Sequence, residues 1–163
     1  KLPDLTYMRW CAQWWSMAVS ITPRIVFSPG VANAWNYPRP KWMLCWHKPG
    51  AVSYNASGGF NIWEPLLFYG DGPRITDDAY SSTPLNFTKE EWREHPCPKH
   101  PGLWQWALAR VSRPDETVLD FFAGSGTTGR VAKNLGRKAI LVERVERYCE
   151  TAAKRMSQTV MAL

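Results

Sequence analysis

The stretch VLDFFAGSGTTG, residues 118–129, decides the fold of this chain. Its first half is a short apolar run, which is typical of a buried β-strand. Its second half is rich in glycine, serine and threonine, and residues 130–135 then form a helical pattern that Gly136 would cap. A strand, a glycine turn and a helix in this order direct backbone N–H groups and a helix N-terminus toward a ligand. Glycine suits such a turn because a Cβ atom would block close approach to the backbone.

The glycine spacing alone is compatible with more than one ligand. Gly124, Gly126 and Gly129 satisfy G-x-G-x-x-G, and Glu143 follows 19 residues after Gly124, as in dinucleotide-binding proteins. A phosphate-binding P-loop is excluded because Arg130 stands where that loop needs lysine. The chain after the motif has room only for a strand over 139–143 and a helix over 144–158. The rest of any sheet must precede the motif, which is not the order of a nicotinamide-binding domain.

The motif and its surroundings resemble the DNA amino-methyltransferases, which use S-adenosylmethionine to methylate adenine N-6 or cytosine N-4. The cofactor motif of that family is Asp-Pro-Phe-Ala-Gly-Ser-Gly-Thr-Thr-Gly, and residues 120–129 depart from it only at Phe121. Its circularly permuted subclass shows further matches at Leu135-Gly136-Arg137, at Tyr148-Cys149 and at His95-Pro96-Cys97-Pro98-Lys99. The matches cover residues 95–156, and their combination is far more specific than the glycine spacing.

The resemblance implies a site for S-adenosylmethionine at the ends of two strands. Asp120 would accept a hydrogen bond from the methionine ammonium, Thr127 would hold the carboxylate, and Glu143 would bind both ribose hydroxyls. The implied cofactor-binding residues are Asp120, Phe121, Phe122, Ala123, Gly124, Ser125, Gly126, Thr127, Glu143 and Lys99. The alternatives are a strand-end cap for Asp120 and a solvated charge for Glu143.

The same resemblance implies a Rossmann-like α/β methyltransferase fold, with a mostly parallel sheet, an antiparallel edge strand and helices on both faces. Apolar patterns predict helices over 5–20 and 102–112, and strands over 24–27, 42–46 and 64–69. We expect residues 1–163 to form a single domain that is incomplete on its N-terminal side. Residues 71–92 are polar and lack periodicity, so they form a solvated loop or, as the resemblance implies, a small target-recognition loop.

The resemblance also implies a DNA contact and a missing catalytic segment. Trp46, His47 and Lys48 match a family strand end beside a loop close to the target base, and are the implied DNA-binding residues. The family's catalytic tetrapeptide, Asp/Asn/Ser-Pro-Pro-aromatic, accepts hydrogen bonds from the target amine, but this sequence has no Pro-Pro dipeptide. We expect the tetrapeptide upstream of Lys1, and Ser28-Pro29 is the only degenerate match.

The composition indicates a globular protein with a polyanionic partner. The chain has 163 residues and a net charge of +6, which favours a polyanionic partner such as nucleic acid. The resemblance implies that this partner is double-stranded DNA. No apolar run is long enough to span a membrane and no signal peptide opens the sequence, so a cytoplasmic location is the default. The four cysteines match no metal-site spacing, and we expect buried free thiols and no metal.

Three functions remain open from the sequence. The favoured one is a DNA amino-methyltransferase of a restriction-modification system. The second is a catalytically inactive relative that binds cofactor or DNA as a module, and the third is a nicotinamide-dependent oxidoreductase. The sequence leaves open the target base and whether the protein forms a homodimer.

Overall fold

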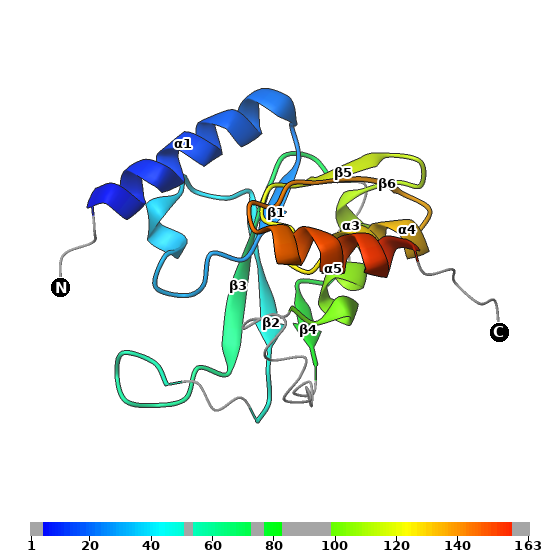
Figure 1. Cartoon of the computed structure of the whole chain (residues 1–163). Coiled ribbons are helices and arrows are strands. Elements are labelled where there is room, and N and C mark those ends of the chain that lie inside the picture. The colour runs from blue at the N-terminus through cyan, green and yellow to red at the C-terminus, as the bar shows by residue number, and fades with distance from the viewer. Residues whose placement is uncertain (1–4, 51–53, 73–76, 83–98, 158–163) are drawn as a thin grey trace. The chain divides into compact units, whose positions relative to one another are not determined.

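The computed structural model describes residues 5–50, 54–72, 77–82 and 99–157 (Figure 1). The chain divides into two compact units, Lys1–Pro84 and Leu85–Leu163. Each unit has its own sheet, with four strands in the first and two in the second. Among the described helices, none combines the length and the apolar character that a membrane crossing requires.

The first unit is built on a mixed four-stranded sheet. Helix α1 (Leu5–Ile21) precedes β1 (Ile25–Phe27), and the 3-10 helix η1 (Ala34–Asn36) precedes β2 (Trp42–His47), β3 (Trp63–Tyr69) and β4 (Ala79–Ser81). The spatial order is β1-β3-β2-β4. Strand β3 is antiparallel to both β1 and β2, whereas β4 is parallel to β2.

Strand β3 contributes a continuous buried run to the core of this unit. Leu66, Leu67 and Phe68 are almost fully buried. Because successive side chains of a strand point to opposite faces, their burial means that both faces of β3 are covered. Gly70 ends the strand with φ +85°, and a Cβ atom there would lie 1.8 Å from the carbonyl oxygen of Pro23. Only glycine therefore allows β3 to end beside the turn that precedes β1.

Helix α1 attaches to the first unit through a cluster of aromatic rings. It buries Cys11, Trp14 and Ala18, whose spacing places them on one face of the helix. The Trp14 ring lies 5.0 Å from that of Phe27, which in turn lies 4.7 Å from that of Tyr37. Burial in this cluster raises the pKa of the Tyr37 phenol, with its hydrogen bond to the Cys11 thiol as a second cause.

The second unit contains the predicted strand, turn and helix. Its elements are α3 (Pro101–Val111), β5 (Thr117–Asp120), α4 (Thr127–Asn134), β6 (Lys138–Leu141) and α5 (Glu146–Ser157). Strands β5 and β6 pair in parallel, and α4 provides the crossover that a parallel pair requires.

Helix α3 begins at a capping histidine. His100 Nδ1 accepts a hydrogen bond from the Gly102 N–H at 3.0 Å, and Pro101 takes the first helical position, where no N–H is needed. Burial lowers the pKa of His100, which favours the neutral imidazole that can accept this bond.

The predicted elements are present, with ends that differ by a few residues. Helix α4 begins three residues earlier than predicted, because Thr127 and Thr128 of the turn already have helical geometry. Strand β4 forms within residues 71–92, where the sequence shows no periodicity. Residues 73–76 and 83–92 of that segment lie outside the described part. The four described pairings are two parallel and two antiparallel, a larger antiparallel share than predicted.

Candidate functional site

The glycine turn joins the end of β5 to the start of α4. The Asp120 carboxylate accepts a hydrogen bond from the Phe122 N–H at 2.9 Å, which fixes the first residues of the turn. The Ala123 N–H donates to the carbonyl of Val142 at 3.1 Å and ties the turn to the residue after β6. Gly126 then adopts φ +80°, a left-handed conformation that glycine allows without strain, and α4 follows directly.

Glu143 meets the glycine turn from the end of β6. Its Oε2 accepts a hydrogen bond from the Gly124 N–H at 2.9 Å, and its Oε1 accepts from the N–H groups of Arg144 and Val145 at 2.8 and 2.9 Å. A carboxylate has about four acceptor positions, so backbone donors use at least three of them. Binding both ribose hydroxyls, as the resemblance implies, would therefore displace at least one backbone donor.

Two glycines of the motif allow close packing of the chain on itself. A Cβ atom on Gly126 would lie 2.8 Å from the Cβ of Ala152 in α5. A Cβ atom on Gly129 would lie 2.6 Å from Cδ1 of Leu141 and 3.1 Å from the sulfur of Met156. The space beside Gly126 and Gly129 is thus filled by protein atoms, and glycine at these positions serves the packing of α4 against β6 and α5.

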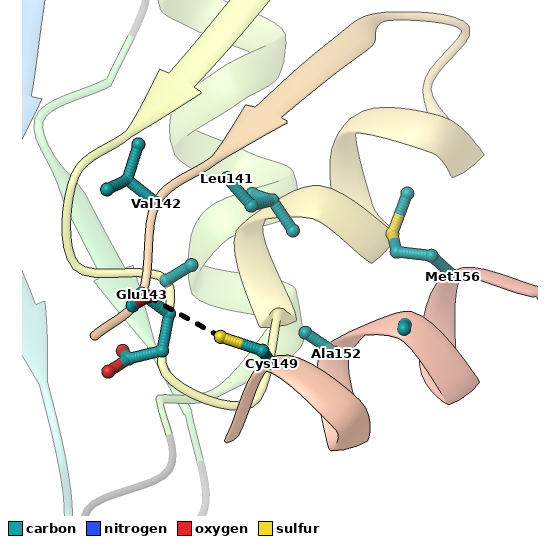
Figure 2. A pocket seen from close by; sticks show the side chains of 8 residues that line it. Leu141, Val142, Glu143, Cys149, Ala152 and Met156 are labelled. Carbon is teal, nitrogen blue, oxygen red and sulfur yellow. Dashed lines mark hydrogen bonds between the residues drawn. The ribbon is translucent and has the colours of Figure 1, made fainter. Parts of the chain in front are cut away.

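A pocket of about 410 Å³ lies between β6, α5 and the glycine turn (Figure 2). Its walls are mainly small and apolar side chains: Ala123, Leu141, Val142, Ala152, Ala153 and Met156, with Cys149 and Glu143 beside them. Figure 2 shows the Glu143 carboxylate turned away from Cys149 and Met156. Of the predicted cofactor residues, Ala123 and Glu143 line this pocket, and the pocket combines an apolar wall with one carboxylate at its rim.

The pocket contains a thiol that the sequence did not indicate. Cys149 is exposed, and its Sγ donates to the carbonyl oxygen of Glu143 at 3.4 Å. The prediction of buried thiols is confirmed for Cys11 and wrong for Cys149, while Cys45 is half-buried. Cys97 lies outside the described residues.

An arginine of α5 also reaches the start of α4. The Arg155 Nη1 donates to the hydroxyl oxygens of Ser125 at 3.3 Å and Thr127 at 3.0 Å, and both of these side chains are buried. Because the guanidinium donates to the Thr127 oxygen, the hydrogen of the Thr127 hydroxyl can be donated to a different acceptor. Arg155 was not among the predicted site residues, because its contact depends on how α5 packs against the turn.

Three other predicted cofactor residues, Phe121, Phe122 and Lys99, lie outside the pocket. Phe121 is half-buried and Phe122 is exposed, and their ring centroids lie 6.4 Å apart. Lys99 lies two residues before α3 and is half-buried. Neither phenylalanine nor Lys99 lines the pocket.

Two of the predicted DNA contacts, Trp46 and His47, are hydrogen-bonded within the first unit. Trp46 is only 7% exposed, and its indole N–H donates to the Ser82 hydroxyl at 2.8 Å. His47 Nδ1 lies 3.1 Å from the Ser81 hydroxyl. The Trp46 ring is therefore held in the protein, between β2 and the residue after β4.

Lys48 and Ser28 meet at one carboxylate. The Lys48 ammonium forms an ion pair with Glu64 and lies 5.0 Å from the centroid of the Trp46 ring. The Ser28 hydroxyl, the weak catalytic candidate, donates to the other oxygen of Glu64 at 3.0 Å. Its neighbour Pro29 accepts a hydrogen bond through its carbonyl oxygen. The structure thus joins one predicted DNA contact and one catalytic candidate in a half-buried network.

Two relatives match parts of the chain at the sequence level. The Type II methyltransferase M2.LlaDCHI of Lactococcus lactis subsp. cremoris is 33% identical over 97 residues, which cover 59% of this chain and 35% of that protein. The Type II methyltransferase M.HinfI of Haemophilus influenzae is 40% identical over 70 residues, which cover 43% of this chain and 20% of that protein. The chain thus spans about a third or less of the relatives that it matches.

Solved structures identify the fold, and a family model identifies the family. The M1.HpyAVI–SAM complex aligns with a TM-score of 0.74 at 23% identity, covering 96% of this chain and 85% of that one. The cytosine-N4-specific PvuII DNA methyltransferase aligns with a TM-score of 0.59 at 18% identity, covering 74% and 52%. These alignments confirm the Rossmann-like methyltransferase fold. Since the DNA methylase model of N6 and N4 enzymes matches residues 8–154, the chain belongs to the N6/N4 DNA methylase family.

Proposed function

We propose that this chain binds S-adenosylmethionine and serves the transfer of its methyl group to the exocyclic amine of adenine or cytosine in DNA. The observation that carries the proposal is the hydrogen bond between the Glu143 carboxylate and the Gly124 N–H. It joins an acid and a glycine turn at the carboxyl ends of two adjacent parallel strands. Ligands of open α/β sheets bind at that edge.

The described residues fit the polar groups of this cofactor. Glu143 can accept a ribose hydroxyl in exchange for a backbone donor, and Asp120 can accept a hydrogen bond from the methionine ammonium. The N-terminus of α4 suits the methionine carboxylate, and the Thr127 hydroxyl can donate to it because Arg155 occupies the oxygen from the other side. Bound in this way, the cofactor would supply a methyl group on a positively charged sulfur.

The acceptor side of the reaction requires more than cofactor binding. An exocyclic amine is a weak nucleophile. An enzyme must therefore take the base out of the stack and accept hydrogen bonds from the N–H groups of the amine. No residue in the described part of the chain is assigned to this step. Ser28 stays a weak candidate, since its proton is directed to Glu64 and only its lone pairs could receive an amine. A module that binds cofactor without transferring methyl is therefore the second candidate function.

Calorimetric titration with S-adenosylmethionine, with NAD as control ligand, tests the cofactor half of the proposal. We expect the chain to bind S-adenosylmethionine and not NAD. Asp120→Ala should weaken binding. Asp120→Asn is the matched variant, because its amide oxygen can still accept from Phe122 while the charge that faces the ammonium is removed. Binding of NAD alone, or unchanged affinity in both Asp120 variants and in Glu143→Ala, would overturn the cofactor assignment.

Transfer of a labelled methyl group to duplex DNA tests the other half. Label recovered in adenine or cytosine would establish the methyltransferase and name the target base. Cofactor binding without transfer would favour the second candidate. A homodimer and a cytoplasmic location stay predictions, and sedimentation of the chain tests the first of them.

A further inference from the structure

The side chain of Arg155, near the C-terminal end of α5, contacts the start of α4. Its guanidinium donates to the hydroxyl oxygens of Ser125 and Thr127 at 3.3 and 3.0 Å. Both hydroxyl residues are more than nine-tenths buried, whereas Arg155 is half-buried. Arg155 thus holds the residues on either side of Gly126, at the point where the glycine turn becomes a helix.

Two cations of α4 hold the part of α5 from which the Arg155 side chain extends. The Arg130 guanidinium donates to the carbonyl oxygen of Arg155 at 3.2 Å, and the Lys133 ammonium donates to that of Met156 at 2.7 Å. Carbonyl groups in the last turn of a helix have no partner within the helix, so these bonds satisfy them and complement the negative end of the helix dipole. The end of α5 is therefore fixed against α4, together with the origin of the Arg155 side chain.

Positive charge collects at the start of α4. Gly126 occupies the N-cap and offers no side-chain oxygen, and the first turn of α4 contains no acidic residue. Within the described ranges, Arg155 forms no ion pair with a carboxylate, and the Glu143 carboxylate accepts from backbone N–H groups of the turn and of residues 144 and 145. A cation beside the positive end of a helix dipole is unfavourable. An anionic group of a ligand would therefore complement the helix end and the guanidinium together.

We infer that Arg155 is a positioning residue for the carboxylate of the methionine part of the cofactor. Because it donates to the Thr127 oxygen, it leaves the hydrogen of that hydroxyl for the carboxylate, and it adds a positive charge at the start of α4. The inference rests on the cofactor of the proposed function. It adds to the strand–turn–helix motif a residue of α5, which acts on the ligand through Thr127.

Calorimetric titration of the full 163-residue chain with S-adenosylmethionine and with decarboxylated S-adenosylmethionine tests this role. The second ligand keeps the sulfonium, the amine and the nucleoside and lacks the carboxylate. Arg155→Gln should lower the affinity for S-adenosylmethionine roughly 3- to 10-fold and change that for the decarboxylated ligand less than about 2-fold. Thr127→Val should show the same selective loss, whereas Thr127→Ser, which keeps a hydroxyl, should retain the wild-type preference.

Lys154→Gln is the matched control, because it removes the same charge at the neighbouring, exposed position of α5. Loss of any cation favours the more positive, decarboxylated ligand, so this variant measures the non-specific part of the effect. At about 0.15 M salt, which screens exposed charges beyond roughly 8 Å, it should leave the preference between the ligands unchanged. Circular dichroism melting checks that the variants are folded. Arg155→Lys gives a second measurement: it keeps the charge without the planar guanidinium, and should lose part of the preference.

Three outcomes would overturn the inference. They are equal losses for the two ligands in Arg155→Gln, unchanged affinity for both, and an equal change of preference in Lys154→Gln. Equal losses would identify Arg155 as a packing contact between α5 and α4. Failure of the proposed function gives a different result, because the wild-type chain would then not bind S-adenosylmethionine. Binding by the wild-type chain together with any of the three outcomes refutes the role of Arg155 alone.

Discussion

Replacing Gly126 with alanine should test whether the glycine turn is shaped by the packing of α5. Gly126 has φ +80°, and an added Cβ would lie 2.8 Å from the Cβ and 3.0 Å from the Cα of Ala152. The second of these atoms belongs to the helix backbone and cannot swing aside. Gly136 provides a matched control, because it has φ +72° and nothing within 4 Å of an added Cβ.

Both substitutions place an alanine in a left-handed backbone conformation, but only Gly126→Ala also overpacks its surroundings. A left-handed conformation costs an alanine roughly 1–2 kcal/mol at either position. Overpacking adds about 1–3 kcal/mol at Gly126 alone. We therefore expect Gly126→Ala to lower the free energy of unfolding by about 1–3 kcal/mol more than Gly136→Ala. For a chain of this length each kcal/mol corresponds to a melting temperature difference of about 2–4 °C.

Urea unfolding followed by tryptophan fluorescence measures both variants. A second arm adds Ala152→Gly, which removes the Cβ partner and should recover part of the loss when combined with Gly126→Ala, beyond the sum of the single changes. The recovery is partial because the backbone of α5 still lies close to the added methyl group. If the two glycine variants differ by less than about 0.5 kcal/mol, α5 does not restrict Gly126 and the packing explanation is refuted.

Three further predictions concern the ends of β6, α5 and α3. Glu143→Gln should weaken S-adenosylmethionine binding about 10-fold or more by calorimetry, because an amide cannot replace a carboxylate that accepts three backbone bonds. Glu146→Gln, at an exposed position at the start of α5, should have little effect, and equal effects of the two changes would contradict the assignment. S-adenosylmethionine should slow alkylation of Cys149, measured by mass spectrometry, and an unchanged rate would place the cofactor elsewhere. The stability of the wild-type chain should fall as the pH drops below about 6.5, because burial lowers the pKa of His100 in the folded state and unfolding then takes up a proton. His100→Asn, which can cap α3 without titrating, should show a flatter dependence of stability on pH. Identical pH profiles of the two proteins would argue against His100 as the titrating cap.

The local sequence was sufficient to predict the strand, the turn and the helix at the centre of the candidate site. An apolar run, a glycine turn and a capped helical pattern are short-range signals, and β5, the turn and α4 follow them. Glu143 was also singled out in advance, because it follows Gly124 by 19 residues and matches the acid that the resemblance implies after a second strand. The structure accordingly joins Glu143 to Gly124 across 19 residues.

The remaining features depend on tertiary packing. Strand β4 has three residues and pairs with β2 across a long separation, so its own sequence carries too little periodicity to predict it. The contact of Arg155 with Thr127 requires a particular approach of α5 to the turn. Trp46 was assigned to DNA binding because it matches a strand end of the family, but Ser82 supplies a buried acceptor for its N–H from outside the strand.

The bonds around Glu143 make the ribose end of the candidate site an exchange site. When both ribose hydroxyls bind the carboxylate, at least one of them replaces a backbone N–H, and that N–H can return when the hydroxyl is missing. The affinity gained from such a hydroxyl is therefore a difference between two similar hydrogen bonds, one from the ligand and one from the chain. When a ligand hydroxyl is missing, a backbone N–H can restore the hydrogen bond to the carboxylate. The site should therefore tolerate deoxyribose analogues of the cofactor better than a carboxylate that has no backbone donors of its own.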